Sequence, residues 1–256
     1  MEKNRIKSRA VFLRFYEELN DFLPPHKRKI RFEHNYSGTP SVKDLIESLG
    51  VPHTEVDLIL VNGQSATFKY KLNNGDDISV YPEFESMDIT PLQKLRPAPL
   101  RRPRFILDVH LGSLARYMRM LGIDTLYRND YPDEEIIEIS VSGKRAILTR
   151  DLGILKNGTV KRGYFVRNTE PVKQIEEVIN RFDLARNIKE FSRCVKCNSR
   201  LRKIKKETII DILPPKVKQQ RNEFTFCPFC GKVYWKGTHY EKMKKLINSL
   251  KHSAEL

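Results

Sequence analysis

The sequence lacks any apolar run that approaches the ~20 residues a helix needs to span a bilayer. Its basic start, MEKNRIKSR, leads into AVFLRFYEEL, which is too short and too charged for a signal peptide. Cysteine is also scarce, with four residues among 256, and disulfides fit poorly with a cytosolic chain. We therefore expect a cytoplasmic protein with no membrane partner.

Acidic residues are fewer than basic residues, and most of the difference lies towards the C-terminus. The net charge is +15, with 47 Lys and Arg against 32 Asp and Glu. Residues 1–98 are neutral and residues 99–185 carry +3, whereas residues 186–256 hold 18 basic against 6 acidic residues, or +12. Such a segment attracts a polyanion, and RNA or DNA is favoured over a membrane because no amphipathic apolar stripe accompanies the charge. A solvated face that only aids solubility is the alternative.

The four cysteines lie in this basic segment as two CxxC turns, CVKC (Cys194, Cys197) and CPFC (Cys227, Cys230). Two such turns supply four thiolates, which can close a tetrahedral zinc site. Four sulfurs leave no open coordination position, so we expect a structural zinc ion that folds the segment and takes no part in a reaction.

The 29 residues between the two turns are unusually many for a ribbon hairpin, and they include RLRKIKK and PPKVKQQR. We expect them to form a protruding basic arm. After the second turn, KVYWKGTHY interleaves aromatic residues with lysines, which suits either base stacking on RNA or the ribbon's own core. The candidate RNA-binding residues are Arg200, Arg202, Lys203, Lys205, Lys206, Lys232, Trp235, Lys236 and His239.

Residues 9–85 are typical of the order strand (RAVFLRFYEEL), strand (KRKIRFEHNY), helix (VKDLIESLG, capped by Ser41), strand (DLILVNGQ) and strand (DDISVYPEF). The stretches SVKDLIESLGV, LILVNGQ and LNNGDDISVYP resemble the ubiquitin-like β-grasp fold of sulfur-carrier proteins. Those carriers end in a Gly-Gly tail, whereas this chain continues through PEFESMDITP. Carrier chemistry should therefore be absent, and the region is expected to be an interaction module with a protein partner.

Four prolines between residues 86 and 103 indicate a stiff linker and a domain boundary. The expected fold class is α/β and α+β multidomain. The expected domains are a β-grasp domain at 1–88, a Pro-rich linker at 89–103, an α/β domain at 104–188, and a basic zinc ribbon with a C-terminal helix at 189–256.

From Arg104 onward strands alternate with helices, which predicts a mostly parallel sheet. Two of its strand-like runs end on an acid, RFILD at Asp108 and AILTRD at Asp151, while Asp130 and Asp133 lie in the loop that opens a helix. Parallel sheets bind ligands at the carboxyl ends of their strands. Oxygen ligands without His or Cys suit a hard cation such as Mg²⁺ or Mn²⁺.

Each of these acids is also suited to capping a helix, which is the structural alternative. Arg116 and Arg119 are three residues apart in a helical stretch and are candidates for binding a phosphate, although a solvated face is the alternative. Arg150 is a candidate partner for an acid or a phosphate. Asp124, which follows the LG that ends a helix, fits a turn.

The stretches FILDVHLGSLARYMRMLGIDTLY, DEEIIEIS and RAILTRD, followed by CVKC and CPFCGKVYWKGTHY, resemble the Mut-seven carboxy-terminal ribonucleases. This family is a branch of the PIN-like nucleases with an appended zinc ribbon. The resemblance covers residues 104–242, and it implies that Asp108, Asp133 and Asp151 hold Mg²⁺ or Mn²⁺.

The sequence therefore predicts a metal-dependent endoribonuclease that binds RNA through its basic ribbon. A phosphodiester repels an attacking hydroxide, and divalent cations held by carboxylates overcome this repulsion. Two alternatives remain open: a non-catalytic module that binds tRNA, rRNA or the ribosome, and an adaptor that works through the β-grasp domain.

Overall fold

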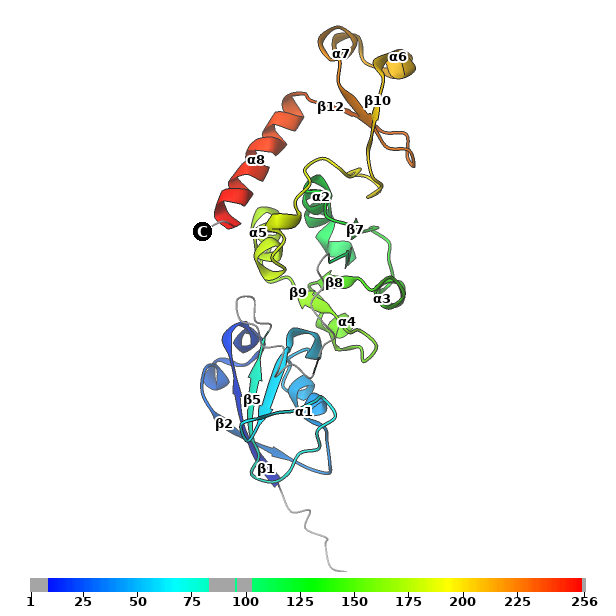
Figure 1. Cartoon of the computed structure of the whole chain (residues 1–256). Helices are drawn as coiled ribbons and strands as arrows, with labels where there is room; N and C mark the ends of the chain where they lie inside the picture. The colour runs from blue at the N-terminus through cyan, green and yellow to red at the C-terminus, as the bar shows by residue number, and fades with distance from the viewer. Residues whose placement is uncertain (1–8, 83–94, 96–102, 255–256) are drawn as a thin grey trace, which may run out of the picture. The chain divides into compact units, whose positions relative to one another are not determined.

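The computed structural model describes residues 9–82, 95 and 103–254. The expected linker at 89–103 lies outside these residues, apart from Leu95 and Pro103. The chain divides into two compact units, which we describe separately. Unit 1 comprises residues 1–100 with Asp151–Phe165, and unit 2 comprises Arg101–Arg150 with Val166–Leu256 (Figure 1).

Unit 1 is built on a mixed sheet with the strand order β2-β1-β5-β3-β4. The central pair, β1 and β5, is parallel, and β1–β2, β3–β5 and β3–β4 are antiparallel. Alternate residues of β1 are buried, which places Val11, Leu13 and Phe15 in the core. The strands are β1 (Arg9–Phe15), β2 (Phe32–Tyr36), β3 (Leu58–Val61), β4 (Gln64–Ser65) and β5 (Asp77–Tyr81). This arrangement confirms the predicted β-grasp fold.

Helix α1 (Val42–Ser48) packs its buried residues Val42, Leu45 and Ile46 into the same core as the sheet. It begins at a capping box: the Ser41 side chain accepts from the Asp44 backbone N–H, and the Asp44 carboxylate accepts from the Ser41 N–H. Such a cap contributes about 1 kcal/mol. It also fixes where the helix starts, which is the position that the sequence predicts.

Unit 1 also contains short 3-10 turns and a later stretch of the chain. The first predicted strand extends to Leu19, but β1 ends at Phe15 because Glu17 has a positive φ of 44° and begins a 3-10 turn. These elements are η1 (Glu17–Phe22), η2 (Pro25–Lys27), η3 (His53–Glu55), α4 (Leu152–Lys156) and β9 (Gly163–Phe165).

In unit 2, β6 lies between β7 and β8 and is parallel to both, as the alternation of strands and helices predicts. All three residues of β6 are fully buried. Helix α5 buries Ile175, Val178 and Ile179, so one face of it meets the core. The elements are β6 (Phe105–Leu107), η4 (Val109–Leu111), α2 (Gly112–Met120), β7 (Thr125–Leu126), α3 (Asp133–Gly143), β8 (Ala146–Thr149) and α5 (Pro171–Arg181).

The C-terminal part of unit 2 is a small antiparallel sheet, β10-β11-β12, followed by a helix. The expected arm is a helical insertion between β10 and β11, and its Ile209 and Leu213 pack on Phe224. None of the described helices is both long and apolar enough to cross a membrane. The elements are η5 (Ala185–Asn187), β10 (Arg202–Ile204), α6 (Lys206–Ile209), η6 (Ile210–Ile212), α7 (Pro215–Gln220), β11 (Phe224–Phe226), β12 (Val233–Trp235) and α8 (Thr238–Ala254).

Candidate functional site

Asp108 follows β6 directly and is almost completely buried, with 3% of its surface exposed. Its Oδ1 accepts from the His110 N–H at 2.8 Å, which caps η4. Its Oδ2 accepts from the Arg150 N–H at 3.0 Å and from the Thr149 hydroxyl. The carboxylate therefore joins the carboxyl ends of β6 and β8, the edge at which the sequence predicts a site.

These three donors leave room for a cation. An ionised carboxylate offers about four lone-pair positions, two on each oxygen. Both lone-pair positions of Asp108 Oδ2 accept hydrogen bonds, whereas Oδ1 accepts one, from the His110 N–H. The donor set thus fits a carboxylate that is oriented by the protein and binds a hard cation through Oδ1.

The other candidate acids are exposed. Asp151 is the first residue of the later segment of unit 1. Its Oδ1 accepts from the Gly153 N–H at 2.6 Å, which caps α4. Asp133 is the first residue of α3, next to the N-cap residue Pro132. Asp130 forms an exposed ion pair with Arg128 at 2.8 Å. The capping interpretation therefore holds for Asp108 and Asp151, and the remaining position on Asp108 Oδ1 is compatible with metal binding.

Two of the candidate arginines hold the protein backbone. The sequence offers Arg119 as a phosphate ligand beside Arg116, but Arg119 is only 3% exposed. Its guanidinium donates to the carbonyls of Thr125, Tyr127, Val195 and Lys196. Arg119 therefore fastens the first CxxC turn to the end of α2, while Arg116 is exposed and remains a candidate.

Arg150 has a comparable role near the end of β8. Its Nη1 lies 2.8–2.9 Å from the carbonyl oxygens of Val166, Arg167 and Asn168. The side chain thus fixes the backbone that follows β9, and the Arg150 N–H orients Asp108. The sequence leaves the role of Arg150 open, and the structure supports a positioning role.

Asp124 is a residue that the sequence does not single out as functional. Its Oδ1 accepts from Arg145 at 2.7 Å and from Asn198 at 2.9 Å, and its Oδ2 accepts from Arg193 at 3.1 Å. Burial opposes ionisation, but these hydrogen bonds and the two arginine charges outweigh it, so the pKa of Asp124 lies below its usual value. Asp124 joins the first CxxC turn to the start of β8.

The four cysteines converge as predicted. The Sγ atoms of Cys194 and Cys230 are 3.5 Å apart, those of Cys197 and Cys227 are 3.3 Å apart, and all four lie within 4.8 Å of one another. Zn–S bonds of about 2.3 Å in a tetrahedron would place the sulfurs ~3.8 Å apart. The thiol cluster, as we call these four side chains, can therefore bind a metal such as zinc.

The electrostatics of the thiol cluster favour a cation. Burial opposes ionisation of Cys227, but backbone N–H groups of Cys230 and Phe229 and neighbouring thiols lower the pKa of Cys227 to about 6. Burial and the adjacent thiols raise the pKa of Cys197 to about 12. The four thiols thus cannot all ionise together unless a positive ion neutralises them.

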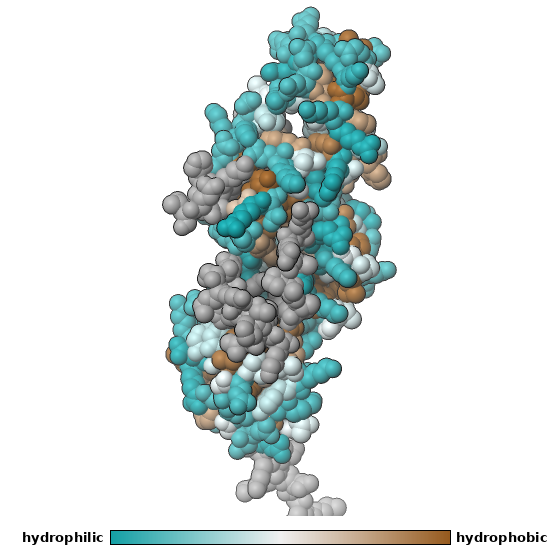
Figure 2. Space-filling view, in the orientation of Figure 1, coloured by the Kyte–Doolittle hydropathy of each residue, from teal (hydrophilic) through white to brown (hydrophobic). Residues whose placement is uncertain are grey.

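Most of the candidate RNA-binding cations are exposed. Arg200, Arg202, Lys203 and Lys205 lie along β10 and its flanks, and the view in Figure 2 shows a mostly hydrophilic surface at this end of the chain. The remaining candidates have partners or lie elsewhere: Lys206 bonds Asn222, Lys236 pairs with Glu223, Lys232 lies over the Tyr234 ring, and the side chain of His239 is outside the described ones.

The two aromatic candidates differ in exposure. Trp235 packs against the Ile209, Leu213 and Phe224 cluster, so it belongs to the ribbon's core. Phe229, in the second CxxC turn, is 80% exposed and is not among the predicted candidates. Its exposure follows from its position inside the CPFC turn, where Cys227 and Cys230 both point into the thiol cluster.

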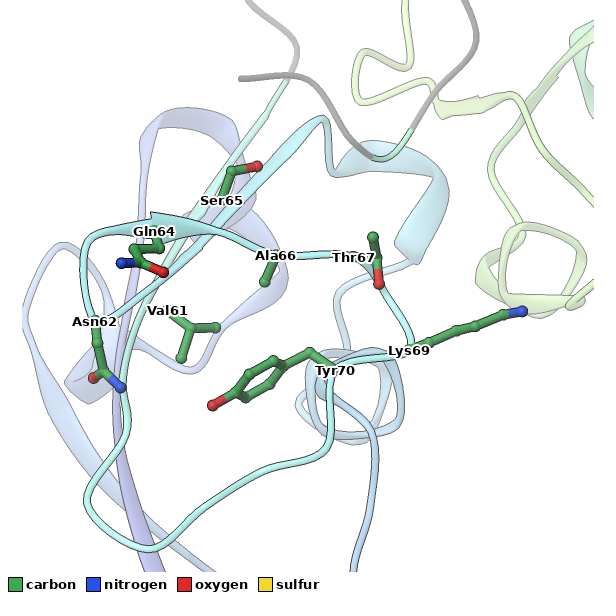
Figure 3. Close-up of a pocket in the computed structure, with 8 residues that line it drawn as sticks. All are labelled: Val61, Asn62, Gln64, Ser65, Ala66, Thr67, Lys69 and Tyr70. Carbon is green, nitrogen blue, oxygen red and sulfur yellow. The ribbon is translucent and has the colours of Figure 1, made fainter. Parts of the chain in front are cut away.

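A separate depression lies on the β-grasp unit, between the β3–β4 hairpin and the loop that follows it (Figure 3). Its lining includes Asn62, Thr67 and Tyr70, and Lys69 is its charged side chain. The Tyr70 ring extends towards Val61 and Asn62 (Figure 3). No acid, His or Cys lines it, so its chemistry differs from that of both sites above.

The chain is thus a modular α/β protein in which a β-grasp unit precedes a parallel-sheet domain with a thiol cluster. Residues 8–88 match the family described as Mut7-C ubiquitin, and residues 103–247 match the Mut7-C RNAse domain. Because the second match spans more than half of the sequence, this protein belongs to the Mut7-C RNase domain family. The structure of SAMP1 from Haloferax volcanii is similar over 30% of this chain and 99% of that one, at 14% identity and a TM-score of 0.25. No curated protein matches the sequence.

Proposed function

We propose that this protein is an endoribonuclease that hydrolyses RNA phosphodiester bonds with Mg²⁺ or Mn²⁺ bound to Asp108, Asp133 and Asp151. The observation that carries the proposal is Asp108, a buried and oriented carboxylate at the end of the central strand of an RNase-family domain. A buried carboxylate is costly unless it is well satisfied, and a cation at Oδ1 would complete its coordination.

The bound cation would neutralise the phosphodiester and lower the pKa of the attacking water. Asp108 is held rigidly by Thr149, Arg150 and His110, so it would supply a fixed ligand. Asp133 and Asp151 are exposed, so each can reach a substrate-side cation or accept a proton from water. We further propose that zinc occupies the thiol cluster and that the exposed cations of β10 and its flanks attract RNA.

The proposal is tested by incubating labelled RNA with the wild-type protein in Mn²⁺ or in chelator. We expect cleavage by the wild type in Mn²⁺ alone, and a loss of at least 10²-fold for Asp133→Asn. Asp133 is exposed, so this variant should keep the wild-type melting temperature. Asp108→Asn should also be inactive, although its amide would present a donor to the Arg150 N–H or Thr149 hydroxyl and would reduce stability.

Asp77→Asn is the matched control. Asp77 is an exposed carboxylate of the β-grasp unit that pairs with Arg31, and it has no place in the proposed site. It should cleave RNA at the wild-type rate. Equal rates for Asp133→Asn and Asp77→Asn would contradict the proposal.

The second candidate function is an RNA-binding module without catalysis. It is favoured by the observation that Asp108 and Asp151 both cap helices, a role that needs no metal. It predicts no cleavage under any divalent ion and equal RNA affinity for the wild type and Asp133→Asn. The incubation above separates the two functions.

A further inference from the structure

The β-grasp unit contains a cluster of buried polar side chains that belongs to neither site described above. Three consecutive residues of η3, namely His53, Thr54 and Glu55, are 7%, 1% and 0% exposed. Burying polar groups is unfavourable unless each finds a hydrogen-bond partner. The identity of their partners therefore indicates what η3 is for.

All three side chains bond to backbone atoms of the segment 151–165. Glu55 Oε1 accepts from the Phe165 N–H at 2.6 Å, and the Thr54 hydroxyl donates to the Leu155 carbonyl at 3.4 Å. The His53 Nε2 lies 2.9 Å from the Val160 carbonyl, and because a carbonyl only accepts, Nε2 carries the hydrogen. The η3 residues thus contact the segment at three separate points along its length.

Further contacts support the same segment. Lys156 Nζ donates to the Glu47 carbonyl at 3.2 Å, and the Phe22 and Phe165 rings meet edge to face at 5.7 Å. Leu155 and Val160 are fully buried. The N-terminal domain therefore supplies both polar and apolar partners to this later stretch of the chain.

The segment depends on such support. Helix α4 has five residues, and isolated helices shorter than about 12–15 residues are marginal in water. Asp151 caps α4 through the Gly153 N–H, so the Asp151 carboxylate is tied to the first turn of this helix. Whatever fixes α4 consequently also restricts Asp151.

We propose that His53, Thr54 and Glu55 of the β-grasp domain are positioning residues for Asp151 of the nuclease site. This inference rests on the proposed function, because it assigns a task to Asp151. It gives the β-grasp domain an intramolecular role: η3 holds α4 and the chain up to Phe165, which keeps the Asp151 carboxylate in the orientation that metal binding requires. Loss of these bonds should therefore weaken catalysis without changing RNA affinity.

The test uses the full chain with Glu55→Gln and, as a milder change, Thr54→Val, which removes the hydroxyl donor and keeps the side-chain shape. Thr67→Val is the matched control, because Thr67 is exposed on the same domain. Hydrogen exchange of the amides of residues 152–165 is the first readout. We expect exchange roughly tenfold faster in Glu55→Gln, a smaller increase in Thr54→Val, and no change in Thr67→Val.

The second readout is kinetic. For Glu55→Gln, kcat for RNA cleavage should fall about tenfold and the Mn²⁺ concentration for half-maximal rate should rise, while KM for RNA stays within twofold. Unchanged exchange in residues 152–165, or equally faster exchange throughout residues 9–82, would overturn the inference. A wild-type protein that cleaves no RNA would refute the proposed function instead, and the exchange comparison would still decide whether η3 holds the segment.

Discussion

Replacing Asp124 with Asn should destabilise unit 2 far more than replacing any exposed acid. The Asp124, Arg145 and Arg193 side chains are only 21%, 11% and 15% exposed, so both arginines would keep buried charge with a weaker acceptor. Breaking a buried ion pair costs 3–5 kcal/mol, and the remaining amide oxygen places the expected loss at the lower end, about 3 kcal/mol. For a unit of this size, the melting temperature should fall by about 6–12 °C.

The effect has a defined dependence on pH. The pKa of Asp124 in the folded protein lies below its unfolded value of about 3.9. The ionised carboxylate therefore makes its full contribution to the free energy of unfolding above pH ~5. It is lost as the pH falls through the folded pKa, and the wild type and Asp124→Asn should then converge in stability.

Denaturant unfolding can be followed through the protein's single tryptophan, Trp235, which reports on the ribbon. Asp130→Asn is the control, because its ion pair with Arg128 is exposed to solvent and should contribute little to stability. If the free energies of unfolding of Asp124→Asn and the wild type differ by less than about 0.5 kcal/mol at pH 7, Asp124 does not stabilise unit 2 through its two arginines.

Three further predictions concern the metal, the arm and a cap. Zinc removal by a chelator, or Cys227→Ser, should shift Trp235 emission to the red while hydrogen exchange of residues 9–82 stays unchanged; a uniform increase would show that the units do not fold separately. Neutralising Lys203 and Lys205 with Gln should reduce the slope of log K for RNA against log salt by about 1.4, and an unchanged slope would exclude them from the interface. Ser41→Ala should cost unit 1 about 1 kcal/mol by denaturant unfolding, since it removes the α1 cap, and a loss below 0.3 kcal/mol would contradict that role.

The sequence predicts the strands and helices well where the spacing of apolar residues and the residues that end or cap an element indicate the same boundary. RFILD and AILT are strands because an uninterrupted apolar run ends at a polar residue, and α1 starts where Ser41 precedes a helical pattern. The convergence of the four cysteines was equally predictable, since CxxC spacing itself creates a metal-binding turn. These features depend on residues that are near one another in the chain.

The partners of long polar side chains were not predictable in this way. Arg119 has the sequence signature of a surface phosphate ligand, yet its partners Val195 and Lys196 are more than 70 residues away. Asp124 resembles a turn residue because Arg193 and Asn198 meet it only in the fold. The helical insertion, by contrast, had a usable signal: Ile209, Leu213 and Val217 recur every four residues, which favours helix over an extended arm.

The two CxxC turns of the thiol cluster differ in how much of the remaining fold depends on them. Carbonyls of Val195 and Lys196 in the first turn are bound by Arg119, so changes in its backbone would disturb α2 and β7 as well. The second turn presents Phe229 to solvent, where an exchange of side chain disturbs no packing. The side chain at position 229 can therefore vary at little cost to stability, whereas the backbone of the first turn is constrained by its bonds to Arg119.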